Sequence, residues 1–203
     1  MARRGALNAP ELIAQNHLVS GFTCGNRQMD AWLVDHALAN EARASRTYVV
    51  ADDAGSVVAY YSLAMGALER AALPRALRHD LPREVPVAVL GRLAIDNEHS
   101  GQGLGGALLA EALQRTLRLS AEIGVRGMIV HAIDDQAAAF YRHFGFVDLP
   151  GSDRTLLMTV ETMSAAVSIM VSPRMTVLSA SFRSETVHLA RKFFSASNID
   201  VTE

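Results

Sequence analysis

The chain has 203 residues, of which 50% are apolar and 20% charged, enough for one well-packed domain with a short appendage. No run approaches the roughly 18 uncharged apolar residues of a membrane span, and no apolar core follows Arg3 and Arg4 as in a secretory signal. The single cysteine, Cys24, cannot form an internal disulfide, which favours a reducing compartment. We therefore expect a cytoplasmic protein without a membrane partner.

Arginine supplies nearly all of the positive charge. The net charge is −2, which gives no nucleic-acid signal by itself, but 18 of the 19 basic residues are arginine. Five of them fall in one stretch: Arg70, Arg75, Arg78, Arg83 and Arg92. The planar guanidinium suits phosphate better than the lysine ammonium does. Genomic base composition would also explain the arginine excess, so composition alone leaves a phosphate-binding face open.

The first part of the chain predicts a helix followed by a β-hairpin. Apolar residues recur at three- and four-residue spacing over residues 26–43, which favours a helix. Two strands, 47–51 and 57–63, flank the turn residues 52–55. Residues 66–86 contain three prolines and predict a short helix within a loop.

The second part alternates strands and helices. The predicted elements are a buried strand at 87–95, a helix at 104–123 covered on both sides and ended by Gly124, a strand at 127–132, a short helix at 134–143 and a strand pair at 146–148 and 155–160. This order, after a leading hairpin, predicts the α/β class with a mixed sheet.

The composition changes near residue 164. Residues 163–173 predict a connector, and residues 175–203 are too few to bury a core of their own. We therefore predict a domain over residues 1–163 and a C-terminal extension of unknown role over residues 164–203.

A glycine-rich segment, Ser100–Gly106, joins a predicted strand to a predicted helix. The first N–H groups of a helix have no partner within it, so such a turn binds anions. Gly101, Gly103 and Gly105 put no side chain between the backbone and a diphosphate. A P-loop would need lysine after the last glycine, and a dinucleotide fold would place the loop after the first strand. Of the diphosphate ligands, coenzyme A remains as the candidate. The alternative is a tight turn that binds no ligand.

Tyr141, on the predicted helix 134–143, is the candidate acid. Transfer of an acyl group from coenzyme A requires a proton for the departing thiolate. By itself a tyrosine here would more often be a core aromatic residue. The alternative is a covalent acetyl-cysteine at Cys24, but this residue fits a structural role at the start of the first helix better. His131 and His143 are interpreted as partly exposed residues that fill space and have no catalytic role.

Together these residues resemble the GNAT N-acetyltransferase superfamily. Its motif Arg/Gln-x-x-Gly-x-Gly/Ala matches residues 100–105, and its motif Asn-x-x-Ala-x-x-x-Tyr matches residues 134–141, followed by Phe-Gly-Phe at 144–146. Ser100 stands where Arg or Gln is usual, and Asp134 where Asn is common. The serine weakens one diphosphate contact, although backbone donors do most of that binding.

Further segments resemble the acetyltransferase toxins of type II toxin–antitoxin modules (TacT-like). These segments are residues 22–25, 29–33, 45–50, 60–64 and 90–96. Such toxins acetylate the amino group of aminoacyl-tRNA and so block translation. The resemblance covers about residues 10–160.

The resemblance implies the GNAT fold, with a splayed mixed β-sheet flanked by helices and a bulge in the strand 87–95. It implies acetyl-CoA as co-substrate, no metal, and Tyr141 as general acid. The implied cofactor-binding residues are Leu93, Ala94, Ile95, Ser100, Gly101, Gln102, Gly103, Leu104, Gly105, Gly106, Asp134, Ala137 and Phe140. An esterified amino acid has an α-amine pKa below the usual value near 8, so no general base is required.

The resemblance also favours binding of tRNA phosphates by arginines that flank the acceptor side of the cleft. These residues are Arg46, Arg75, Arg78, Arg83 and Arg92. The implied partners are aminoacyl-tRNA, a ribbon-helix-helix antitoxin and a second copy of the chain in a homodimer. Two alternatives stay open: an acetyltransferase for a small amine or a protein N-terminus, and a non-catalytic acyl-CoA-binding module.

Overall fold

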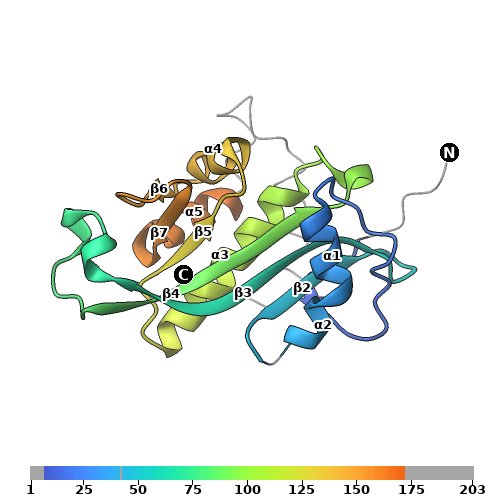
Figure 1. Ribbon diagram of the computed structural model, residues 1–203, viewed down its shortest axis with the longest axis horizontal. Coiled ribbons are helices and arrows are strands. Elements are labelled where there is room, and N and C mark those ends of the chain that lie inside the picture. The colour runs from blue at the N-terminus through green and yellow to red at the C-terminus, as the bar shows by residue number, and fades with distance from the viewer. Residues whose placement is uncertain (1–6, 42, 172–203) are drawn as a thin grey trace. The chain divides into compact units, whose positions relative to one another are not determined.

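A computed structural model describes residues 7–41 and 43–171 (Figure 1). In this part of the chain, seven strands form one mixed sheet in the order β1-β2-β3-β4-β5-β7-β6. The strands are β1 (Glu11–Leu12), β2 (Arg46–Ala51), β3 (Val57–Glu69), β4 (Glu84–Ile95), β5 (Gly127–His131), β6 (Val147–Asp148) and β7 (Thr155–Thr159). β5 is parallel to β4 and antiparallel to β7, so the predicted mixed α/β sheet is confirmed.

The chain divides into two compact units. Among the described residues, unit 1 takes those up to Ser62, Arg92–Glu111 and residues 170–171; unit 2 takes Leu63–Gly91 and Ala112–Ile169. The described helices are α1 (Arg27–Asp35), α2 (Ala37–Asn40), α3 (Leu104–Glu122), α4 (Asp135–His143) and α5 (Val160–Val171), with 3-10 turns η1 (Arg70–Ala72), η2 (Arg75–Leu77) and η3 (Asn97–His99). None of these helices is long and apolar enough to cross a membrane.

In unit 1, α1 and α2 lie against the β2–β3 part of the sheet (Figure 1). The Asn26 side chain accepts hydrogen bonds from two first-turn N–H groups and so starts α1. The single helix predicted over residues 26–43 is wrong, because His36 leaves the helical backbone conformation and separates α1 from α2. Leu33 and Ala37 are both buried on either side of this break, so the apolar spacing continues through it.

The predicted hairpin of β2 and β3 is confirmed. The Asp52 carboxylate accepts hydrogen bonds from the N–H groups of Ala54 and Ser56, and Gly55 takes the positive φ of +83° that the turn requires. β3 continues to Glu69, beyond the predicted end, so the predicted loop over residues 66–86 shrinks to the two 3-10 turns and their flanks.

In unit 2, the 3-10 turns of the β3–β4 connection contribute to an apolar core with the sheet. Leu73 from the connection packs with Val85 and Val87 of β4 and with Ile129 of β5. α4 starts at Asp134, whose carboxylate accepts a hydrogen bond from the Ala137 N–H at 2.7 Å.

The long helix α3 is buried all round only in its first half. Residues 107–113 are fully buried, whereas Leu119 and Ile123 near its end are exposed. The prediction that both sides are covered therefore holds for the part that follows the glycine loop.

The expected connector over residues 163–173 is wrong as far as residue 171. α5 runs through the predicted domain boundary, and Met163, Val167 and Met170 are buried at the i, i+4, i+7 spacing of one helix face. The remainder of the predicted C-terminal extension lies outside the described residues.

Candidate active site

In unit 1, the end of β4 is held in place by Asp96. One of its carboxylate oxygens accepts a hydrogen bond from the Glu98 N–H and the other accepts one from the Thr23 N–H, both at 2.9 Å. Its own N–H donates to the Val58 carbonyl. Asp96 therefore starts η3 and ties the segment before α1 to the strand end. No local sequence motif indicates this role of Asp96, because Thr23 lies 73 residues away in the chain.

The glycine loop follows η3 and opens α3. Gly101 and Gly103 have φ values of +74° and +83°, a backbone conformation that side chains disfavour. The Gly103 carbonyl accepts the first helical hydrogen bond, from the Ala107 N–H, so the N–H groups of residues 104–106 precede the first complete turn. A Cβ built at Gly101 would meet nothing within 4 Å. Open space beside Gly101 and helix N–H groups that start α3 are two features that a diphosphate site requires.

The other predicted loop residues take supporting places. Ser100 ends η3 with its backbone extended, and the Gln102 side chain donates a hydrogen bond to the Glu98 carbonyl at 3.0 Å. Gly105 and Gly106 lie in the first turn of α3, where Gly105 is half-buried and Gly106 is buried.

The last residues of β4 offer backbone groups more than side chains. Ala94 is buried in the unit 1 core with Phe22 and Tyr60, while Leu93 and Ile95 are half-buried. In unit 2, the β4–β5 ladder ends at the pair Leu90–Val130, and β4 itself continues to Ile95.

Arg92, in unit 1, packs on an aromatic side chain. Its guanidinium lies 4.1 Å from the centroid of the Trp32 ring, and Trp32 in turn stacks on Tyr60. The Tyr60 hydroxyl donates a hydrogen bond to the Met29 carbonyl at 2.8 Å, which fixes this stack. Burial lowers the pKa of Arg92, although the side chain remains charged at neutral pH. Within the described residues no carboxylate forms an ion pair with Arg92.

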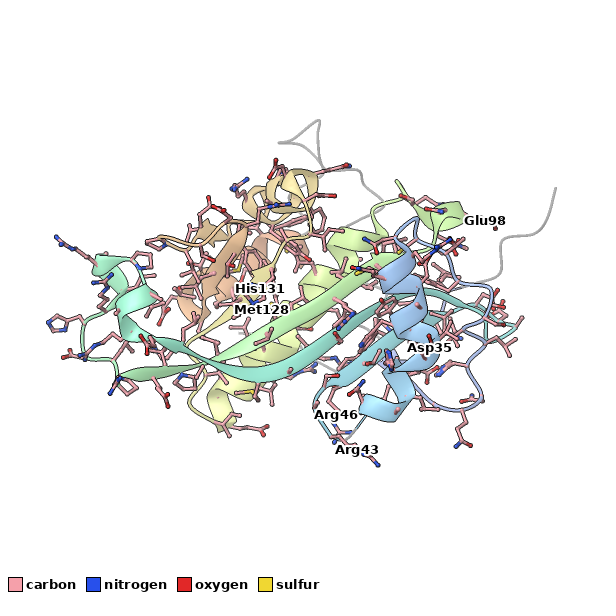
Figure 2. All side chains as sticks on the ribbon, viewed as in Figure 1. Asp35, Arg43, Arg46, Glu98, Met128 and His131 are labelled. Atoms are coloured by element: carbon pink, nitrogen blue, oxygen red, sulfur yellow. The ribbon has the colours of Figure 1, made fainter. Side chains whose placement is uncertain are left out.

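Arg46, also in unit 1, has a carboxylate partner. Its guanidinium donates to Glu41 at 2.6 Å, and this hydrogen bond raises the pKa of Arg46. The second oxygen of Glu41 accepts a hydrogen bond from the Thr47 N–H, so the pair closes the turn before β2. Arg43 is an exposed neighbour at the same turn (Figure 2). A phosphate would have to compete with Glu41 for Arg46.

The three predicted arginines of unit 2 differ in what they contact. Arg78 donates to the carbonyls of Leu73 and Ala71, at 2.8 and 2.7 Å, and so shapes the β3–β4 connection. Arg75 and Arg83 are exposed, and their guanidinium groups form no ion pair with any residue that the structure describes. These two remain accessible to phosphate, whereas Arg78 acts mainly in the loop.

Tyr141 lies on α4 in unit 2 and is only 8% exposed. Its ring makes edge-to-face contacts with Phe140 and Phe146, at centroid distances of 5.2 and 5.5 Å. The Arg142–Asp148 ion pair, with its shortest contact at 2.7 Å, ties α4 to β6. Burial raises the pKa of Tyr141, so its hydroxyl keeps its proton at neutral pH.

The alternative nucleophile, Cys24, is poorly suited to attack. Burial, followed by the hydrogen bond with Asp30, raises the pKa of Cys24 to about 11. The Cys24 N–H donates to the Asp30 carboxylate at 2.9 Å, so the residue belongs to the entry of α1. A helix start does not lower the thiol pKa here, and the structural interpretation agrees with these contacts.

Neither predicted filler histidine lies in a cluster of metal-binding side chains. His131, at the end of β5 (Figure 2), pairs its Nδ1 atom with the Thr155 hydroxyl at 3.0 Å. His143 packs edge-to-face on Phe144. Across residues 7–41 and 43–171, no three His, Cys, Asp or Glu side chains gather as they would around a metal ion.

Comparison with known proteins shows the family of this chain. Residues 43–148, which include both the glycine loop and Tyr141, match the acetyltransferase (GNAT) domain. The chain is 37% identical over 161 residues to a tRNA-acetylating toxin of Mycobacterium tuberculosis (strain ATCC 25618 / H37Rv), covering 79% of this chain and 96% of that protein.

Two solved structures are similar throughout the same part of the fold. AtaT in complex with acetyl-methionyl-tRNAfMet superposes with a TM-score of 0.74 at 28% identity, covering 79% of this chain and 98% of that one. A tyrosine-to-phenylalanine variant of AtaT, bound to the C-terminus of the antitoxin AtaR and to acetyl-CoA, gives a TM-score of 0.68 at 27% identity, covering 78% and 96%.

Proposed function

We propose that this chain, which belongs to the acetyltransferase (GNAT) domain family, is a toxin that transfers acetyl from acetyl-CoA to the amino group of aminoacyl-tRNA and so blocks translation. The observation that supports this most strongly is the 37% identity to a tRNA-acetylating toxin over 96% of that protein's length. A likeness of that extent includes the acceptor-binding parts of the relative as well as its coenzyme site.

Acetyl-CoA supplies the activated acetyl group as a thioester. The backbone of the glycine loop and of the first turn of α3 is the candidate for binding its diphosphate, at Ser100, Gly101, Gln102, Gly103, Leu104, Gly105 and Gly106. The backbone of Leu93, Ala94 and Ile95 at the end of β4 is the candidate for the pantetheine arm and for an N–H that polarises the thioester carbonyl.

On α4, Asp134 has a structural part in this scheme. Its carboxylate starts the helix through the Ala137 N–H, which fixes the positions of Ala137, Phe140 and Tyr141 along the helix. We assign Ala137 and Phe140 to the coenzyme side of α4 from the family motif.

Tyr141 acts as general acid. The substrate amine forms the amide C–N bond, the thioester C–S bond breaks, and the sulfur takes the proton of the Tyr141 hydroxyl. The raised pKa of Tyr141 keeps that proton in place until transfer. An esterified amino acid has a largely neutral amine at cellular pH, so the surplus proton of the amine passes to water without a dedicated base. The Tyr141 oxygen regains a proton from water before the next turnover.

The acceptor tRNA is held through phosphates. Arg92, Arg75 and Arg83 have no carboxylate partner within the described residues and are the main candidates. Arg46 and Arg78 contribute less, because Glu41 and loop carbonyls already engage their guanidinium groups. Each phosphate contact contributes roughly 0.7–0.9 to the slope of log affinity against log salt concentration.

The similar proteins also indicate which macromolecules this chain binds. AtaT has been captured with the C-terminus of an antitoxin, and we infer a corresponding antitoxin for this chain, of the ribbon-helix-helix type, acting on a toxin homodimer. Because aminoacyl-tRNA is used at the ribosome, the cytoplasm is the place of action.

The test is acetylation of a pool of aminoacylated tRNA. The protein is incubated with acetyl-CoA and charged tRNA, and the recovered aminoacyl groups are analysed by mass spectrometry. We expect a gain of one acetyl group on the amine and a rate that falls steeply with salt. Acetylation of polyamines, free amino acids or peptides in preference to charged tRNA, or a flat salt dependence, would favour the small-amine alternative. If no acceptor causes release of the coenzyme A thiol, the chain is a non-catalytic acyl-CoA-binding module.

A further inference from the structure

Unit 2 contains a cavity that no step of the proposed reaction uses. Its volume is about 320 Å³. The walls are apolar, with Leu73, Leu77 and Leu81 from the β3–β4 connection, Val87 from β4 and Leu157 from β7. Ligand pockets range from about 300 to 1,000 Å³, so this one suits a small molecule with a compact apolar part.

A cation and an anion line the same cavity as an ion pair. The guanidinium of Arg126 lies 3.4 Å from the carboxylate of Glu161, and both side chains are at least half exposed. The Arg126 backbone is held on both sides, because its N–H donates to the Pro86 carbonyl and its carbonyl accepts from the Val160 N–H. Glu161 lies in the first turn of α5, where the hydrogen bond from its own N–H lowers the pKa of its carboxyl.

The remaining charged groups at the cavity are also paired. His79 lines it, but the imidazole is bonded to the Asp80 carboxylate at 2.7 Å. A ligand with one charge would therefore meet an attracting and a repelling group at Arg126 and Glu161. A ligand with adjacent charges of both signs meets an attracting group for each.

We propose that this cavity binds a free α-amino acid with an apolar side chain. The carboxylate lies against Arg126, the ammonium against Glu161, and the side chain among Leu73, Leu77 and Leu157. Carboxylate–guanidinium hydrogen bonds and burial of the side chain favour the complex together. This proposal stands whether or not the chain acetylates tRNA.

Ligand titration of the full-length protein without acetyl-CoA tests the charge requirement. The probes are L-leucine, 4-methylpentanoate, which lacks the ammonium, and 3-methylbutylamine, which lacks the carboxylate. We expect L-leucine to bind at least about tenfold more tightly than either analogue, as loss of one charge-assisted hydrogen bond implies. No saturable binding of L-leucine, or equal binding of either analogue, would overturn the proposal.

Two variants and a control then place the ligand. Ala76 lines the cavity and is exposed, so Ala76→Phe fills the space without displacing a core residue. Ala76→Phe and Arg126→Gln should each weaken leucine binding by about tenfold or more. Arg118→Gln, at an exposed arginine of α3 that does not line the cavity, should leave binding unchanged.

Leucine binding that survives Ala76→Phe would place the amino acid elsewhere, for example where the acceptor amine binds, and would overturn the assignment. Thermal melts of each variant show whether it is folded. If Arg126→Gln does not fold, Ala76→Phe together with the analogue series still decides the question.

Discussion

At the scale of single residues, Tyr141 is the group on which the proposed transfer depends. Replacing it with Phe removes the acidic hydroxyl and keeps the ring that packs on Phe140 and Phe146. We expect Tyr141→Phe to lower kcat by about 10²–10⁴-fold, the usual contribution of general acid catalysis. The Kd for acetyl-CoA and the Tm should change little. Thiol release at saturating charged tRNA and calorimetric titration of acetyl-CoA measure the two quantities.

The pH dependence provides the control for this substitution. Burial raises the pKa of Tyr141 above its ordinary value near 10, so the acidic form persists as pH rises through the physiological range. The wild-type rate should therefore not decline between about pH 7 and 10 through loss of this proton. A kcat that Tyr141→Phe leaves unchanged would remove Tyr141 from the mechanism.

At the scale of elements, the glycine loop can be separated from an ordinary glycine turn. Gly101 and Gly151 both have φ of +74°, and a Cβ at either position would meet nothing within 4 Å. Gly101→Ala and Gly151→Ala should therefore cost similar stability, about 1–2 kcal/mol of backbone strain. Only Gly101→Ala should weaken acetyl-CoA binding, because its methyl group enters the space beside the α3 amides.

Thermal melts and acetyl-CoA titrations of both glycine variants provide the measurement. Equal acetyl-CoA affinity in the two variants, at equal loss of stability, would show that the loop is a turn without a ligand. This comparison removes backbone strain as an explanation, since both substitutions introduce it at the same φ.

The helices and strands also show which structural features could be predicted from the sequence. Gly55 and Asp52 predict the hairpin because the turn geometry depends on those residues themselves. The break at His36 is not visible, because the apolar spacing of Leu33 and Ala37 fits one helix as well as two. β3 exceeds its predicted end because its last six residues are only partly covered and contain alanine and glycine, which are uncommon in strands.

In the candidate site, too, residues of local motifs could be predicted, whereas residues defined by distant contacts could not. The glycine loop and Tyr141 could be found from the sequence because each belongs to a local motif of fixed spacing. Asp96 could not, because its role depends on a hydrogen bond to Thr23, which lies 73 residues away in the chain. The pairing of Arg126 with Glu161 beside a cavity, and the partner of Arg46, likewise require coordinates.

At the scale of the whole molecule, α5 continues the described fold past the predicted domain boundary at residue 163. A chain that stops after Met163, the predicted domain boundary, loses Val167 and Met170, which are 9% and 3% exposed. Burial of each such side chain contributes about 1.5–3 kcal/mol at most. Native proteins are stable by only about 5–15 kcal/mol, so this loss is a large fraction of the total.

We therefore expect two truncations to behave differently. A protein of residues 1–171 keeps α5 complete and is the reference for the comparison. A protein of residues 1–163 should melt about 5–20 °C lower, since each kcal/mol shifts Tm by about 2–4 °C at this size. Differential scanning fluorimetry of both proteins makes the comparison. Equal melting temperatures would mean that the buried face of α5 adds nothing to stability, and would restore residue 163 as the end of the domain.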